Sequence, residues 1–142
     1  IEHHLRPALM SHGDDLATTR AVFRYFRSAG DAAVDTLYLN LADYLAARGP
    51  FLEKDEWAAY TKKVRHILES GVDLQEKAPS SPRLVEGNAL MAELALLPGP
   101  LVGRLLDAIQ EAQATGEVNT RDAAIALARR IIASQGKESG HA

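Results

Sequence analysis

The sequence contains no cysteine in its 142 residues. That absence excludes a disulfide framework, a thiol nucleophile and a thiolate metal site, and it fits the reducing cytoplasm that we predict as the location. Long apolar runs are also missing: none approaches the roughly 20 residues that a membrane-spanning helix needs. No signal-type segment opens the chain. We therefore expect no membrane partner.

Strand-like alternation of apolar and polar residues is absent as well, which argues against a β-sheet. Apolar residues make up 46% and charged residues 25% of the chain, values typical of a globular protein. The formal net charge is −3, so no overall positive field attracts nucleic acid. Any contact with RNA would have to come from a local basic surface.

Helical spacing of apolar residues predominates instead, and we predict an all-α fold. We expect an irregular bundle of about six to seven helices. Proline breaks helices and glycine commonly ends them. On that basis, the first helix ends near Leu5, before Pro7. The others are expected from Asp14 or Asp15 to Arg27, from Asp31 to Gly49, from Glu53 to Ser70, around Ala89–Leu96, from Pro100 to Thr115, and from Asn119 or Thr120 to Ser134. The expected N-caps of later helices are Asp14 or Asp15, Asp31, and Asn119 or Thr120. The expected helix stops are Gly30, Gly49, Gly71 and Gly116.

The stretch from Lys77 to Gly87 has the composition of a loop, with two prolines and two consecutive serines. Such residues favour turns over helices. We predict that it separates two helical subdomains. The expected organisation is a helical region over residues 1–76, a linker over 77–87, a C-terminal helical subdomain over 88–134 and a frayed tail over 135–142.

Histidine and aspartate side chains near the start of the chain are the candidates for a metal site: His3, His4, His12, Asp14, Asp15 and, further on, Asp43. Their spacing does not match a metalloprotease-type motif, and a catalytic metal needs several converging ligands. We interpret them as surface and helix-end residues. No Ser/His/Asp or Cys/His arrangement can be named either, so we predict neither a metal site nor catalytic residues in this chain.

The basic residues give a more specific pattern. Arg20, Arg24 and Arg27 are spaced i, i+4 and i+7, which places them on one face of a helix. Arginines in such a stripe can bind phosphates. A second basic cluster consists of Lys62, Lys63 and Arg65. We predict that these six residues contact RNA. The alternative is a solvated helix face whose charges pair with nearby acids.

Several segments resemble a known family. Residues 82–91 (PRLVEGNALM), 97–103 (LPGPLVG) and 111–121 (EAQATGEVNTR) resemble the C-terminal helical region of bacterial tRNA nucleotidyltransferases and poly(A) polymerases. The segment His4–Pro7, the Arg20 helix and Leu41–Asp43 resemble the end of that family's HD-type domain. Two departures stand out: Ala89 replaces a usual aspartate, and Ala95 replaces a frequent glycine.

The resemblance implies that the catalytic machinery lies elsewhere. The family's nucleotidyltransferase head, with its metal-binding acidic pair and nucleotide pocket, precedes the region that this chain resembles. Magnesium and nucleoside triphosphates are thus implied for the parent enzyme, and no cofactor for this chain. The His-Asp pair of HD domains is absent; His3 or His4 and Asp43 are candidates for its remaining ligands.

We therefore interpret the chain as a helical fragment that binds tRNA weakly, through contacts with the RNA backbone. We expect that it adds no nucleotides on its own. Its other expected partners are the catalytic head and, through an apolar patch near Ile1 and Leu5, a second copy. Two alternatives remain open: the scaffold of an HD-family metal-dependent phosphohydrolase, and a helical protein-interaction module. The sequence does not distinguish a parent that adds CCA from one that adds A alone.

Overall fold

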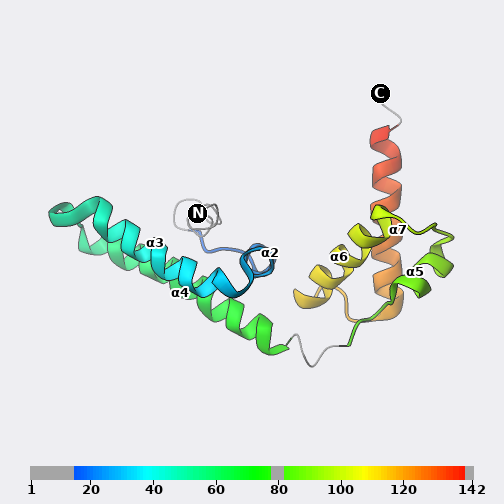
Figure 1. Cartoon of the computed structure of the whole chain (residues 1–142), viewed down its shortest axis with the longest axis horizontal. Helices are drawn as coiled ribbons and strands as arrows, with labels where there is room; N and C mark the ends of the chain where they lie inside the picture. Colours follow the sequence, from blue (N-terminus) through cyan, green and yellow to red (C-terminus); the bar gives the residue numbers. More distant parts are fainter. Residues whose placement is uncertain (1–14, 78–81, 140–142) are drawn as a thin grey trace. The chain divides into compact units, whose positions relative to one another are not determined.

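The computed structural model describes residues 15–77 and 82–139. The all-α class is confirmed: those residues form helices and no strand (Figure 1). The expected first helix ending near Leu5 lies outside the described residues. The α-helices are α2 (Thr19–Ala29), α3 (Ala33–Arg48), α4 (Lys54–Lys77), α5 (Gly87–Leu94), α6 (Pro100–Ala114) and α7 (Arg121–Ser139), and two short 3-10 helices are η1 (Gly30–Ala32) and η2 (Gly49–Phe51).

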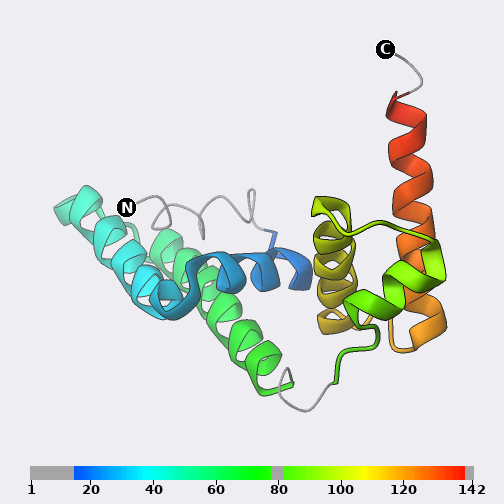
Figure 2. The same cartoon turned by 45° about the vertical axis from the view of Figure 1, so that its right-hand side comes forward.

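The chain divides into two compact units, an N-terminal unit (Ile1–Lys77) and a C-terminal unit (Ala78–Ala142). In the N-terminal unit, α3 and α4 lie side by side as an antiparallel pair joined by η2 (Figures 1 and 2). Helix α2 packs mainly against α4. The core of this unit comprises Ala17, Val22, Tyr25, Phe26, Ala33, Leu37, Val64 and Ile67.

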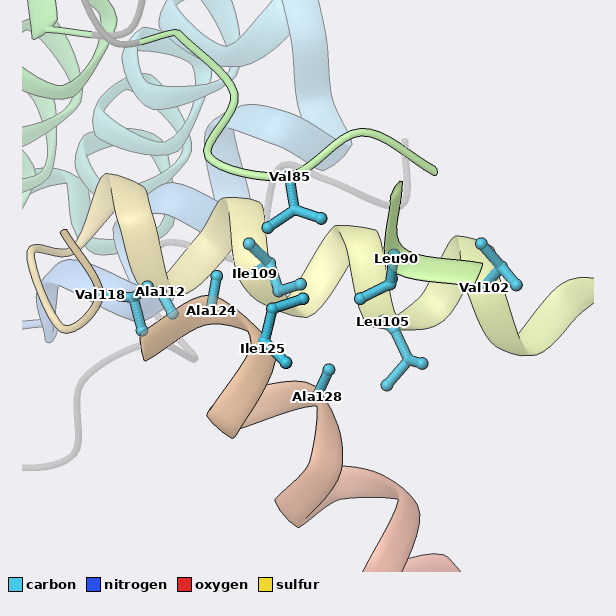
Figure 3. Packing of buried hydrophobic residues seen from close by; sticks show 10 residues of the cluster. All are labelled: Val85, Leu90, Val102, Leu105, Ile109, Ala112, Val118, Ala124, Ile125 and Ala128. Carbon is cyan, nitrogen blue, oxygen red and sulfur yellow. The ribbon is translucent and has the colours of Figure 1, made fainter. Parts of the chain in front are cut away.

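The C-terminal unit has its own core, built around α6. Helices α5 and α7 both pack on α6. Leu90 of α5, Leu105 of α6 and Ala128 of α7 are completely buried. Figure 3 shows the ten residues of this cluster: Val85, Leu90, Val102, Leu105, Ile109, Ala112, Val118, Ala124, Ile125 and Ala128. None of the helices in residues 15–77 and 82–139 is long and apolar enough to cross a membrane.

The start of α2 differs from the sequence prediction. Thr18 is the N-cap, and its Oγ1 accepts a hydrogen bond from the Ala21 amide at 3.2 Å. Asp15 lies before the helix, outside capping position, and Asp14 is outside the described residues. Threonine fulfils this role because its oxygen satisfies an amide that has no partner within the helix. The helix ends at Ala29, where Gly30 adopts φ 56°, as predicted.

Asp31 does not cap α3, contrary to the sequence prediction. It lies within η1, and α3 begins at Ala33 without a side-chain cap. A 3-10 turn commonly bridges consecutive helices, and here it carries the chain from α2 directly into α3. The predicted end of α3 is confirmed, since Gly49 is its C-cap.

Gly71 was expected to end α4, but the helix continues to Lys77. The residue is buried in the helix interior, and a Cβ atom there would overlap the ring carbons of Phe26. Glycine costs a helix interior only about 1 kcal/mol relative to alanine. Its function at this position is to let the α2 ring approach the α4 backbone closely.

In the C-terminal unit, α5 begins two residues earlier than the sequence suggested and ends at Leu94, because Ala95 adopts a left-handed conformation (φ 51°). The predicted cap at Thr120 is confirmed: its Oγ1 accepts from the Ala123 amide at 3.2 Å. Helix α7 extends past Ser134 to Ser139, so residues 135–139 of the expected tail are helical. The single Gly136 is too weak a breaker to stop a helix.

Two tyrosines of the N-terminal unit have hydroxyls held inside it. The Tyr25 hydroxyl donates to the Ala33 carbonyl at 2.6 Å, and the Tyr60 hydroxyl donates to Asn40 Oδ1 at 3.1 Å. Burial raises the pKa of Tyr25, which the Thr36 side chain partly opposes. Burial also raises the pKa of Tyr60. Tyr44 and Asp43 raise this pKa a little further, and the positive charge of Arg48 opposes them.

A raised tyrosine pKa makes stability depend on alkaline pH. The neutral hydroxyl is favoured in the folded state, so its contribution is complete below the ordinary pKa of 10.0 and is lost as the pH rises through the folded value. We expect the melting temperature to fall above about pH 10. The fall should be smaller in Tyr25→Phe. The matched control, Tyr38→Phe on an exposed side chain, should follow the unmodified chain; equal curves for all three would contradict this prediction.

Candidate nucleic-acid interface

Helix α2 carries the arginine stripe on the face opposite its buried side. Val22, Tyr25 and Phe26 pack into the core, whereas Arg20, Arg24 and Arg27 are all exposed. At 100° per residue, the three arginines lie roughly opposite those buried side chains. The helix contains no acidic residue. The structure therefore brings together the three arginines that the sequence analysis selected.

Three contacts fix α2 to the rest of the N-terminal unit. The Phe26 ring lies against Gly71 of α4, and the Tyr25 hydroxyl reaches the start of α3 at Ala33. Just before the helix, His66 Nε2 lies 2.8 Å from the Ala17 carbonyl oxygen. A carbonyl can only accept, so Nε2 donates this hydrogen bond. The arginine face is thus mounted on a supported element, which keeps a binding surface preorganised.

The spacing of the arginines suits a phosphate backbone. Seven residues separate Arg20 from Arg27, a rise of roughly 10 Å along the helix axis. Guanidinium groups stay charged at all physiological pH values and bind phosphate oxygens in a bidentate fashion. Such contacts provide affinity and orientation without sequence readout. Arginines in this arrangement suit a polyanion as ligand.

The second basic cluster is less coherent. Lys62 and Arg65 of α4 are exposed, but Lys63 is half-buried. Lys62 and Arg65 are spaced i, i+3 and therefore share the exposed face of α4. Lys63 lies nearer the side on which Val64 and Ile67 pack into the core. The second basic cluster thus consists of an exposed pair, Lys62 and Arg65, and one half-buried lysine. Its contact with RNA stays a prediction.

The residues considered for metal binding are not assembled in the described part of the chain. His3, His4, His12 and Asp14 lie outside it. Asp15 and Asp43 are both exposed, before α2 and on α3 respectively. Within residues 15–77 and 82–139, no group of three histidine, aspartate or glutamate side chains could hold a metal ion.

An aromatic cluster between α3 and α4 was missed by the sequence analysis. Tyr44 stacks on Tyr60 with ring centroids 4.0 Å apart, and Trp57 lies at 5.9 Å from Tyr44. Arg48 covers Tyr44 at 3.5 Å from the ring centroid and pairs with Glu56 at 3.7 Å. The i, i+4 spacing of Tyr44 and Arg48 was the available signal. Tyr60 and Arg48 both cover the ring of Tyr44, so this ring has no free face on which a base could stack. The cluster instead joins α3 to α4.

Comparison with known proteins identifies the family to which this chain is similar. Residues 60–128, from the first third of α4 into α7, match the family model for tRNA nucleotidyltransferase domain 2. An A-adding tRNA nucleotidyltransferase of Deinococcus radiodurans is 38% identical over 107 residues, which is 75% of this chain. The chain belongs to the tRNA nucleotidyltransferase family. A second member, a CC-adding tRNA nucleotidyltransferase of Thermus thermophilus, is 38% identical over 117 residues, or 82% of the chain.

The matched parts are small portions of these tRNA nucleotidyltransferases. They amount to 24% of the Deinococcus protein and 25% of the Thermus protein. The chain therefore spans about a quarter of the length of the curated relatives it matches. No solved structure matches it.

Proposed function

We propose that this chain is a tRNA-binding helical part of a tRNA nucleotidyltransferase, and that α2 contributes the contact through its arginine face. The observation that carries the proposal is the clustering of three exposed arginines, Arg20, Arg24 and Arg27, on one face of α2. The relatives' names supply the substrate, since both are tRNA nucleotidyltransferases.

The expected mode of binding is recognition of the RNA backbone. Double-stranded RNA is contacted mostly through its phosphates and its shape, and arginines on a supported helix suit that task. Because the chain as a whole carries a net charge of −3, affinity should be weak. It should fall further as salt rises, because each phosphate contact releases counterions. The same basic face inside a longer protein would orient tRNA while other parts of that protein act on it.

We assign nucleotide addition to another part of the full-length enzyme, outside this chain. Nucleotidyl transfer needs carboxylate-held metal ions and a nucleotide pocket. The exposed Asp15 and Asp43 lie on separate elements and offer no such pair. Magnesium and the nucleoside triphosphate would be held elsewhere in the full-length enzyme.

Changing Arg20, Arg24 and Arg27 together to alanine tests the proposal. We expect the dissociation constant for a tRNA transcript at low salt to rise about tenfold or more, a loss of at least roughly 1.4 kcal/mol. The dependence of log affinity on log salt should also become shallower, by about two to three units of slope, because three phosphate contacts no longer release counterions. A filter-binding or fluorescence-anisotropy series over several salt concentrations measures both quantities.

A matched control separates a specific surface from total charge. Arg104, Arg129 and Arg130 are exposed residues of the C-terminal unit, and changing all three to alanine removes the same charge. This variant should keep most of the affinity. Equal losses in the two triple variants would mean that only net charge matters, and the assignment of the interface to α2 would then be wrong.

A further inference from the structure

The C-terminal unit contains a cavity of about 170 Å³ between α6 and the extended segment that precedes α5. Two contacts hold this segment on the helix. Gln113 Nε2 donates to the Pro82 carbonyl at 2.8 Å, and Val85 is buried in the core beside Ile109 (Figure 3). The cavity is therefore a feature of the packed unit, with walls from two anchored elements.

The lining combines an apolar floor with a polar rim. Val85, Ile109 and Leu106 provide apolar surface, while Arg83, Asp107 and Gln110 bring polar groups. A water molecule occupies about 30 Å³ in the liquid, so the space corresponds to several waters. Pockets for complete drug-sized ligands have about 300–1,000 Å³. The cavity thus has room for one ring system, and it is too small for a whole nucleoside triphosphate.

The charges of the rim argue against an anion as the ligand. Arg83 and Asp107 line the same cavity, so their charges offset one another and no net positive field remains for a phosphate. A neutral flat ring is better suited, because its faces can contact the apolar floor while its edge meets amides and charged groups. Glutamine, arginine and carboxylate side chains are among the groups with which proteins hydrogen-bond to base edges.

We propose that this cavity binds one unpaired nucleobase of the RNA. This inference rests on the proposed function, which brings RNA to the protein, and it adds a second contact of different chemistry from the arginine face. Proteins that recognise RNA beyond its backbone commonly capture unstacked bases of single-stranded regions. Gln110 offers both a donor and an acceptor to the base edge, whereas the arginines of α2 contact the backbone.

Gly103 is the position at which an added side chain is expected to block the cavity without disturbing the fold. It lines the cavity, and a Cβ atom there would meet no heavy atom within 4 Å. Leucine is also a better helix former than glycine by about 1 kcal/mol. Gly103→Leu should therefore fold normally and fill the space. The matched control is Gly136→Leu, since Gly136 also lies within a helix and has nothing within 4 Å of its Cβ position.

The experiment uses the 142-residue chain with nitrogen-15 labelling and three probes: adenosine, a single-stranded oligoadenosine, and inorganic phosphate. Adenosine and the oligonucleotide should shift the side-chain amide resonances of Gln110 and Gln113 and the Gly103 amide, and phosphate should not. Base–protein contacts of this kind are worth about 1–3 kcal/mol. Gly103→Leu should accordingly weaken oligonucleotide binding roughly 5- to 100-fold, and Gly136→Leu should not.

The outcomes distinguish base binding in the cavity from RNA binding by the arginine face of α2. In the variant with alanine at positions 20, 24 and 27, adenosine should still shift the glutamine amides, because the nucleoside has no phosphate for the arginines to bind. If that variant loses tRNA affinity but Gly103→Leu binds the oligonucleotide like the unmodified chain, the cavity proposal is overturned and the α2 interface stands. Unmoved amides at saturating adenosine, or equal shifts with phosphate, also overturn it.

Discussion

Truncation of Leu105 to alanine is expected to lower the free energy of unfolding of the C-terminal unit by about 2–5 kcal/mol. Leu105 is completely buried in the cluster shared by α5, α6 and α7. Its removal loses the transfer free energy of the side chain and leaves a cavity that the surrounding helices fill only in part. In a unit of this size, each kcal/mol lowers the melting temperature by roughly 4–8 °C, so thermal unfolding followed by circular dichroism should show a large shift.

Leu97 offers the matched control. It lies in the turn between α5 and α6 and is 87% exposed, so Leu97→Ala makes the same chemical change without emptying a buried space. We expect an effect within about 0.5 kcal/mol, as for other surface substitutions. Similar losses for the two alanine variants would show that the packing around Leu105 is not what stabilises this unit.

Replacing Gly71 with alanine is expected to destabilise the N-terminal unit by about 1–3 kcal/mol, although alanine is the better helix former. Helix propensity favours alanine by about 1 kcal/mol. Against it, the added methyl group would overlap the ring of Phe26, which is itself buried. Overlap with a packed ring forces the two helices apart, so steric repulsion outweighs propensity. Urea unfolding of the variant measures the difference.

Two further variants test that explanation. Gly136→Ala places the same methyl group in open space within α7 and should be neutral or stabilising by up to about 1 kcal/mol. The double variant Gly71→Ala with Phe26→Leu should recover part of the loss, since a smaller side chain leaves room for the methyl. A fully additive double-mutant cycle, with no coupling between positions 26 and 71, would rule out direct overlap.

Local chemistry made several features of the fold predictable from the sequence. Gly30 and Gly49 end helices where expected, and Thr120 caps α7. The arginine stripe of α2 was also correctly placed on one face, because i, i+4 and i+7 spacing depends only on helix geometry. These predictions needed no information about which elements pack together.

The sequence was less informative where tertiary packing decides the outcome. Gly71 looks like a helix stop in the sequence, and only the approach of Phe26 explains why it lies inside α4. Lys63 looks equivalent to Lys62, but it is half-buried because α4 turns Val64 toward the core. The cavity beside Gln110 requires the path of the segment before α5, which no local pattern specifies.

The aromatic residues are distributed so that spectroscopy can follow one unit at a time. All eight, namely three phenylalanines, four tyrosines and one tryptophan, lie between Phe23 and Tyr60 in the N-terminal unit. The sole tryptophan, Trp57, packs beside Tyr44. Intrinsic fluorescence and near-ultraviolet circular dichroism are therefore blind to the C-terminal unit, whereas far-ultraviolet circular dichroism records helices in both. Unfolding curves from the two probes, measured on one sample, should assign each transition to its unit without any added label.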